Sequence, residues 1–317
     1  MAKLQTPRFV YIGGRLRSWE EAVLHVGCEA VTRGLSVFEG IRGFWQPDGS
    51  FAILMLRQHY ERLFRSARIL HIPFEKSYDE YKAIIDELIG ALIEPGLAMW
   101  SRTTLFVTEG HWGEDTVADL VVTAYNLYAE EFPLAINLGI SSWRRSEDVS
   151  LPARVKSASN YQVGRLARIE GRKQGCQDMV LLNRSGRVAE GTGSCLLMAR
   201  GGAIHTPSAS EGALESITVN IVEALAGSFG IEFVRRPVER TELLVADEIA
   251  LCGTLADITL VKTIEGMPLR QPSILSAIQS AYLKACNGTE PHPFVELTPL
   301  PACSPGKTAR NSAGGKA

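Results

Sequence analysis

The stretch RVKSASNY, residues 154–161, decides the fold of this chain, and its lysine is Lys156. Small residues follow the lysine, and a segment of helical composition comes directly after them. Small neighbours leave room for a bulky planar group, and a lysine held out of water can attack a carbonyl carbon. Taken alone, the stretch is more typical of a solvated surface lysine, so its meaning depends on the rest of the chain.

Three further stretches combine a loop with a polar group. VAEGTGS, residues 188–194, places Glu190 at a strand end before two glycines, which allow a tight turn or the close approach of a ligand. GALESIT, residues 212–218, leads into a predicted helix whose first amides and dipole attract an anion such as phosphate. CGTLADIT, residues 252–259, is similar to a strand-end loop with a hydroxyl and exposed amides. Taken separately, the first stretch is also explained by a plain turn with a solvent-facing acid, and the second by an ordinary Ser216 N-cap, which is common.

Composition excludes several classes of protein. The chain has 317 residues, 45% hydrophobic and 21% charged, which is typical of globular proteins with one large or two medium domains. A net charge of -2 gives no reason to expect nucleic acid or an anionic membrane as a partner. No membrane span and no signal peptide are predicted. The six scattered cysteines lack a CxxC pair and the histidines lack HExxH, so we expect reduced thiols, a cytoplasmic protein and no metal.

Periodicity and turn residues predict strands and helices that alternate along the chain. The acidic, proline-containing segment 129–138 reads as a linker, and the residues from 297 onward, rich in Pro, Ser, Gly, Ala and Lys, read as a disordered tail. Predicted strands in the first part cover residues 9–12, 36–43, 51–55, 103–107 and 120–125, with helices over 58–69 and 78–92. Helices over 160–175 and 216–229 and a β-rich region follow. The sequence thus predicts domains at residues 1–128 and 139–296, the linker 129–138 and the tail 297–317.

Taken in order, the four stretches resemble the fold type IV pyridoxal-phosphate enzymes, in particular the branched-chain amino acid aminotransferases. GLSVFEGIR, residues 34–42, and ERLFRSA, residues 61–67, support the resemblance, which runs from about Tyr11 to about Leu269. The resemblance implies a mixed α/β fold, with a small N-terminal α/β domain and a larger C-terminal β-rich α/β domain. It also implies that pyridoxal 5'-phosphate (PLP) binds between the two domains.

The resemblance assigns cofactor-binding roles residue by residue. Lys156 would carry PLP as a Schiff base and then move a proton between the substrate and the cofactor. Glu190 would pair with the pyridine nitrogen and keep it protonated. Tyr161, five residues beyond the lysine, would hydrogen-bond the 3-oxygen of the ring. The remaining cofactor residues are Leu214 against a ring face and, around the phosphate, Arg62, the amides of Ile217 and Thr218 and the hydroxyl of Thr254.

The substrate side departs from the branched-chain pattern. Arg33 stands where those enzymes usually have Tyr, WSRT (residues 100–103) replaces Tyr-x-Arg-Pro, and residues 157–159 replace a pair of glycines. One hypothesis is that Arg33 and Arg102 bind a substrate carboxylate while Trp100 reshapes the pocket. The alternative is that Arg33 pairs with a nearby acid, Glu29 or Glu39. The predicted substrate-binding residues are Phe38, Arg33, Trp100, Arg102, Thr254 and Leu255.

The resemblance implies an enzyme that moves an amino group between a hydrophobic, branched-chain L-amino acid and a 2-oxo acid such as 2-oxoglutarate. It also implies a homodimer or a higher homo-oligomer. A transaminase of the same fold that acts on D-amino acids, β-amino acids or amines stays open, as does a lyase similar to the aminodeoxychorismate lyases. A binding protein that has kept the fold is a further alternative. Addition of an amino acid alone separates the transaminases from the lyase, because only a transaminase converts the cofactor to its pyridoxamine form.

Overall fold

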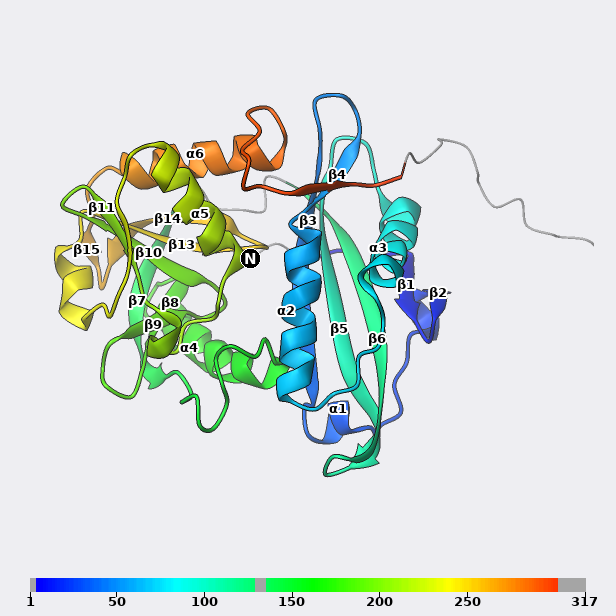
Figure 1. The fold of residues 1–317 in the computed structure, drawn as a ribbon. Coiled ribbons are helices and arrows are strands. Elements are labelled where there is room, and N and C mark those ends of the chain that lie inside the picture. Colours follow the sequence, from blue (N-terminus) through cyan, green and yellow to red (C-terminus); the bar gives the residue numbers. More distant parts are fainter. Residues whose placement is uncertain (1–3, 129–134, 302–317) are drawn as a thin grey trace, which may run out of the picture.

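The computed structural model describes residues 4–128 and 135–301, which form two sheets that lie side by side with helices packed on them (Figure 1). In the described part, one sheet has seven strands in the order β16-β4-β3-β5-β6-β1-β2. The other has nine, in the order β12-β11-β10-β13-β14-β7-β8-β9, with β15 paired to β14. The predicted mixed α/β fold class is confirmed by this arrangement and by the structural neighbours described below.

The seven-stranded sheet is built almost entirely from the N-terminal part of the chain. Its longest pair of strands is the hairpin of β5 and β6, which are paired from Ala98↔Leu127 to His111↔Glu114. Helices α2 and α3 pack on it, and their apolar faces bury Leu63, Tyr81 and Leu88 completely. The elements are β1 Phe9–Ile12, β2 Arg15–Ser18, α1 Glu29–Thr32, β3 Ser36–Trp45, β4 Phe51–Leu54, α2 Leu56–Ile69, α3 Tyr78–Leu92, β5 Ala98–His111, β6 Glu114–Leu127 and β16 Leu297–Pro299.

The nine-stranded sheet is buried on both faces. One face carries α5 and α6, whose Ile221 and Ile278 lie in one core with Leu197 of β10. The other face buries Leu196 and Leu243 in a separate core. The elements are β7 Ala135–Arg144, α4 Gln162–Lys173, β8 Asp178–Leu182, β9 Val188–Gly191, β10 Cys195–Arg200, β11 Ala203–Thr206, α5 Ile217–Ser228, β12 Phe233–Arg235, β13 Glu248–Gly253, β14 Asp257–Ile264, β15 Met267–Pro268 and α6 Ile274–Cys286, with short 3-10 helices at Trp19–Glu21, Ala158–Tyr161, Ala209–Glu211 and Arg240–Val245.

Two predicted boundaries differ from the structure. The nine-stranded sheet already begins at Ala135, inside the predicted linker, because β7 continues back along β14 through the pair Ala135↔Leu260. The predicted tail begins too early, because β16 pairs antiparallel with β4 through Thr298↔Ile53. Residues 302–317, the rest of that predicted tail, lie outside the described residues. Within the described ranges, no helix has both the length and the apolar composition needed to cross a membrane.

Candidate active site

A cavity of about 560 Å³ lies where the two sheets meet. The seven-stranded side contributes residues of β3, α2 and β5, and the other side contributes the loop before α4, β9 and the loops before α5 and β14. Most of the residues that the sequence singled out line this one cavity: Phe38, Arg62, Trp100, Arg102, Lys156, Tyr161, Glu190, Leu214, Thr254 and Leu255. Three predicted residues, Arg33, Ile217 and Thr218, do not line it.

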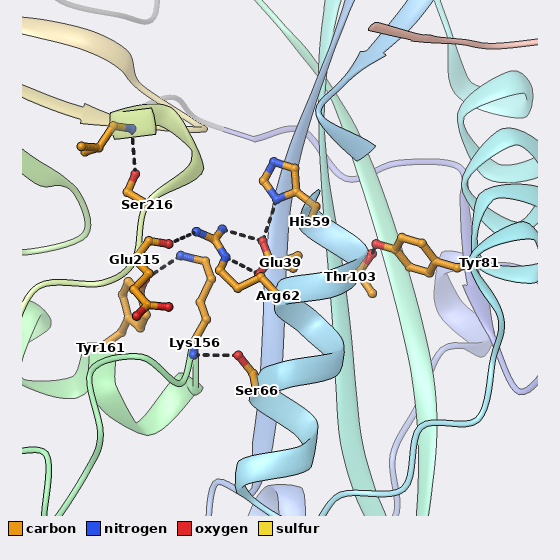
Figure 2. Close-up of polar contacts among 11 residues, drawn as sticks. Glu39, His59, Arg62, Ser66, Tyr81, Thr103, Lys156, Tyr161, Glu215 and Ser216 are labelled. Atoms are coloured by element: carbon orange, nitrogen blue, oxygen red, sulfur yellow. Dashed lines mark hydrogen bonds and ion pairs between the residues drawn. The ribbon is translucent and has the colours of Figure 1, made fainter. Parts of the chain in front are cut away.

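Lys156 is held rigidly at the boundary of the two sheets. Its amide donates to Ser66 Oγ of α2 at 3.2 Å (Figure 2), and its carbonyl accepts from the Phe38 amide of β3 at 2.9 Å, so both polar groups of its backbone are bonded to the N-terminal part of the chain. Its Nζ donates to the Tyr161 hydroxyl at 2.7 Å and lies 4.9 Å from the centre of the Phe38 ring. The amine therefore points into the cavity beside a phenol.

Glu190, at the end of β9, is fixed from two sides. One carboxylate oxygen accepts from the Leu214 amide at 2.9 Å, and the other is paired with Arg145 Nε at 3.0 Å. Arg145 also donates to the carbonyls of Asn160 at 2.8 Å and Gly212 at 3.2 Å. This buried arginine thus connects the loop of Lys156 to the acid, and the sequence analysis missed it. The residues around Arg145 in the sequence do not indicate this role. Arg145 contacts Glu190, Asn160 and Gly212 only because three separate segments of the chain meet at the end of β7.

Helix α4 packs very closely against the turn that follows Glu190. A Cβ atom on Gly164 would lie 2.2 Å from the Thr192 carbonyl oxygen, which is far inside a van der Waals contact. Glycine at this position therefore lets the helix approach the turn. The approach places Arg168 where its guanidinium donates to the Thr192 hydroxyl and pairs with Asp178 at 3.1 Å.

Arg62 lies in a completely buried charge network with Glu39 and His59 (Figure 2). Its Nε and one terminal nitrogen donate to the two Glu39 oxygens, each at 2.7 Å, and His59 Nδ1 lies 2.7 Å from Glu39. Burial by itself would raise the pKa of Glu39, but the Arg62 charge and the hydrogen bonds outweigh burial and lower it to about 2. Burial lowers the pKa of His59, with Glu39 acting in the opposite direction. Glu39 therefore stays ionised and holds Arg62 in one orientation.

The donors beside Arg62 suit a phosphate group. Its other terminal nitrogen donates to the Glu215 carbonyl at 2.9 Å, which joins it to the start of α5. Three of its five N–H groups are used in this way, and two stay available. The amides of Ile217 and Thr218, in the first turn of α5, have no acceptor among the described residues. A helix start with free amides beside an arginine is a site where phosphate binds favourably.

The loop of Thr254 and Leu255 is braced by a buried ion pair. Arg42 donates to the Leu255 carbonyl at 2.9 Å and pairs with Asp257 at 3.1 Å. Asp257 has a φ of 50°, in the left-handed region, so the chain turns sharply there. This bracing fixes the amides of the loop at the edge of the cavity.

On the substrate side, apolar and cationic groups lie together. Trp100 is buried and stacks on Tyr125 with ring centres 5.8 Å apart. Arg102 lies 3.9 Å over the Phe38 ring, and no described carboxylate pairs with it. Burial lowers the pKa of Arg102, although a guanidinium stays charged at neutral pH.

Arg33 lies outside the cavity of the single chain. Its guanidinium pairs with Glu29 at 3.1 Å and lies 4.7 Å over the Trp112 ring. Of the two acids considered in the sequence, Glu29 is therefore its partner, since Glu39 is occupied by Arg62. The ion pair with Glu29 agrees with the alternative in which Arg33 pairs with a nearby acid. A role of Arg33 in binding a substrate carboxylate stays a prediction.

The family model for amino-transferase class IV matches residues 36–264, more than half of the chain. The chain belongs to this family. The branched-chain-amino-acid aminotransferase of Escherichia coli K12 is 30% identical over 291 residues, which cover 88% of this chain and 93% of the relative. The class IV aminotransferases use PLP, so the predictions of an aminotransferase and of its cofactor are confirmed.

Solved structures of other aminotransferases are similar to this class IV aminotransferase over nearly the whole chain. The branched-chain aminotransferase of Thermoproteus uzoniensis with norvaline has a TM-score of 0.87 and 29% identity, covering 93% of this chain and 99% of that one. The branched-chain amino acid aminotransferase of Thermobaculum terrenum in its PLP form has a TM-score of 0.85 and 29% identity, with 94% and 99% covered. These likenesses confirm the prediction of fold type IV.

Proposed function

We propose that this aminotransferase moves the amino group of a hydrophobic, branched-chain L-amino acid to a 2-oxo acid such as 2-oxoglutarate. The observation that carries the proposal is the cavity in which the Lys156 amine meets the Tyr161 hydroxyl at 2.7 Å, with the Glu190 carboxylate fixed on the same lining. An amine, a phenol and a fixed carboxylate are the groups needed to hold an aldehyde cofactor and to move protons near it.

We assign the cofactor contacts from this geometry. Bound PLP supplies an electron sink that makes the hydrogen on the substrate Cα acidic. Lys156 would bind the cofactor covalently and then accept and return that hydrogen as a proton, because its amine is already held at the reacting atom. Glu190 would keep a proton on the ring nitrogen, and Tyr161 would orient the 3-oxygen. The remaining contacts would come from Leu214 on a ring face and, around the phosphate, from Arg62, Ile217, Thr218 and Thr254.

The substrate assignment rests on the lining and on the relatives. Phe38, Trp100 and Leu255 offer an apolar wall, which favours an aliphatic side chain by burying its surface. Arg102 offers a charged donor for a carboxylate, such as the second one of 2-oxoglutarate. The relatives named for branched-chain amino acids support the same substrate class.

A panel of amino donors tests the proposal on the purified enzyme. Leucine, isoleucine and valine should convert the cofactor to its pyridoxamine form, seen as a loss of visible absorbance, and 2-oxoglutarate should restore it. D-Amino acids, β-amino acids and amines form the comparison set. The substrate proposal fails if a member of that set reacts faster than all three branched-chain donors. Release of pyruvate from added aminodeoxychorismate, without an aminated cofactor, would instead favour the lyase alternative.

We also propose a homodimer, located in the cytoplasm. An exposed apolar patch supports the dimer: Val23, Val26 and Trp112 are each at least three-quarters exposed, and Trp112 is joined to Glu29 by a hydrogen bond of its amide at 3.3 Å. Arg33 borders this patch, so any contact it makes with a substrate carboxylate would cross the dimer interface. The free cysteines of the described part support a reducing compartment. Sedimentation of the enzyme and of the Val26→Asp variant tests the dimer.

A further inference from the structure

One wall of the cavity is formed by arginines of α4. The cavity lining includes Arg165, Arg168 and Arg172, on the face of the helix that begins beside Tyr161. Arg165 lies four residues beyond Tyr161, about one helical turn, and Arg172 seven residues beyond Arg165, about two turns, so these side chains lie on one face of the helix. The row of Arg165, Arg168 and Arg172 thus begins one turn beyond Tyr161 and continues along α4. Arg165 and Arg172 are exposed.

The charges around the cavity are strongly unbalanced. Glu190 is the single acid among the described lining residues, and Arg145 already pairs with it. The basic lining residues are Arg62, Arg102, Lys156, Arg165, Arg168 and Arg172. Arg62 is neutralised by Glu39, and Arg168 pairs with Asp178. No carboxylate among the described residues pairs with the other arginines, Arg102, Arg165 and Arg172.

The unpaired arginines exceed what the proposed reaction needs. The cofactor phosphate has Arg62 and the start of α5, and a substrate carboxylate has Arg102 and the amides of the Thr254 loop. Arg165 and Arg172 have no assigned anion. Like charges gathered at a cavity raise the local concentration of anions, and planar guanidinium groups bind carboxylates by paired hydrogen bonds.

We propose that Arg165 and Arg172 form an outer anion subsite that binds the distal carboxylate of an extended acidic amino donor or 2-oxo acid. This inference rests on the proposed aminotransferase activity, since it extends the acidic substrates of the same cavity to dicarboxylates longer than 2-oxoglutarate. The subsite differs from Arg102, which is partly buried over Phe38, because the two α4 arginines are exposed at the outer wall. Aliphatic donors would leave the subsite empty, and long dicarboxylic donors would occupy it.

The test compares variants of α4 that remove one positive charge each. Arg165→Gln, Arg172→Gln and the double variant keep a good helix former at each position. Lys173→Gln is the matched control, because Lys173 is an exposed cation of the same helix that does not line the cavity. For each holoenzyme, kcat/KM is measured with leucine and with the acidic series glutamate, 2-aminoadipate and 2-aminopimelate. Binding of pimelate is measured by calorimetry at low and high salt.

We expect the wild type to gain in kcat/KM along the acidic series, and the double variant to lose about tenfold in the ratio of 2-aminopimelate to leucine, from two exposed charge contacts. Its pimelate affinity should fall by a similar factor and become less sensitive to salt. Lys173→Gln should keep the wild-type ratio and affinity. Equal ratios and equal pimelate affinity in the wild type and the double variant overturn the subsite. Failure of every donor, with pimelate binding that still depends on the two arginines, would instead overturn the proposed reaction and keep the subsite.

Discussion

Substitution of Glu39 by Gln should destabilise the protein strongly, because it leaves the Arg62 charge buried without a counter-ion. The folded environment lowers the pKa of Glu39 from 4.5 to about 2. A difference of roughly 2.5 units, at about 1.4 kcal/mol per unit, corresponds to about 3.5 kcal/mol of folding free energy. That value agrees with the ~3–5 kcal/mol typical of breaking a buried ion pair by removing one partner.

The pH dependence follows from the direction of the shift. A carboxylate with a depressed pKa stabilises the fold fully above its unfolded pKa and loses that contribution as the pH falls toward the folded value. The difference between wild type and Glu39→Gln should therefore be largest near neutral pH and shrink to less than about half at pH 3. Urea unfolding followed by circular dichroism at several pH values measures it.

Glu87→Gln provides the control, because Glu87 is exposed on α3 and has no ion pair among the described residues. It should change the free energy of unfolding by less than about 0.5 kcal/mol. Titration with PLP gives a second readout: Glu39→Gln should weaken cofactor binding, since Arg62 loses the two bonds that orient it. Equal urea midpoints for the two variants at pH 7, with equal PLP affinity, would refute this reasoning.

Three other substitutions and one control substitution probe the site and its packing. Lys156→Ala should lower turnover by at least about 10²-fold and abolish the borohydride-stable attachment of PLP, measured by mass spectrometry; wild-type turnover would contradict its role. Glu190→Gln should lower kcat by about 10²-fold while PLP still binds, and an unchanged kcat would exclude the assignment. Gly164→Ala should cost about 1–3 kcal/mol in unfolding measurements, because its Cβ would meet the Thr192 carbonyl. Gly227→Ala in α5, where the Cβ meets nothing within 4 Å, should instead stabilise by about 0.5–1 kcal/mol.

The sequence predicts well those elements whose ends are marked by capping or turn residues. Helix α3 matches its predicted range, because Ser77 and Glu80 form a capping box at its start and Pro95-Gly96 follows its end. The hairpin strands β5 and β6 were predicted far too short. At the tip of the hairpin both strands are polar and partly exposed, so they lack the apolar signal there, and pairing between the two strands holds them extended instead.

Some site residues could be predicted from a sequence motif, and others could be found only in the folded chain. Lys156 and Glu190 stand in short motifs with a fixed spacing, which the sequence displays directly. Arg145 and the pairing of Glu39 with Arg62 depend on loops and helices that meet only in the folded chain. A buried charge has no sequence signature of its own, since its partner can lie anywhere in the chain.

The pairing of β16 with β4 has a consequence for how the chain can fold during synthesis. The two strands are more than 240 residues apart, and the whole nine-stranded sheet is made between them. Until β16 has been synthesised, the edge of β4 is an open template for strands of other nascent chains. The seven-stranded sheet therefore gains its edge strand late, after the whole nine-stranded sheet has been synthesised.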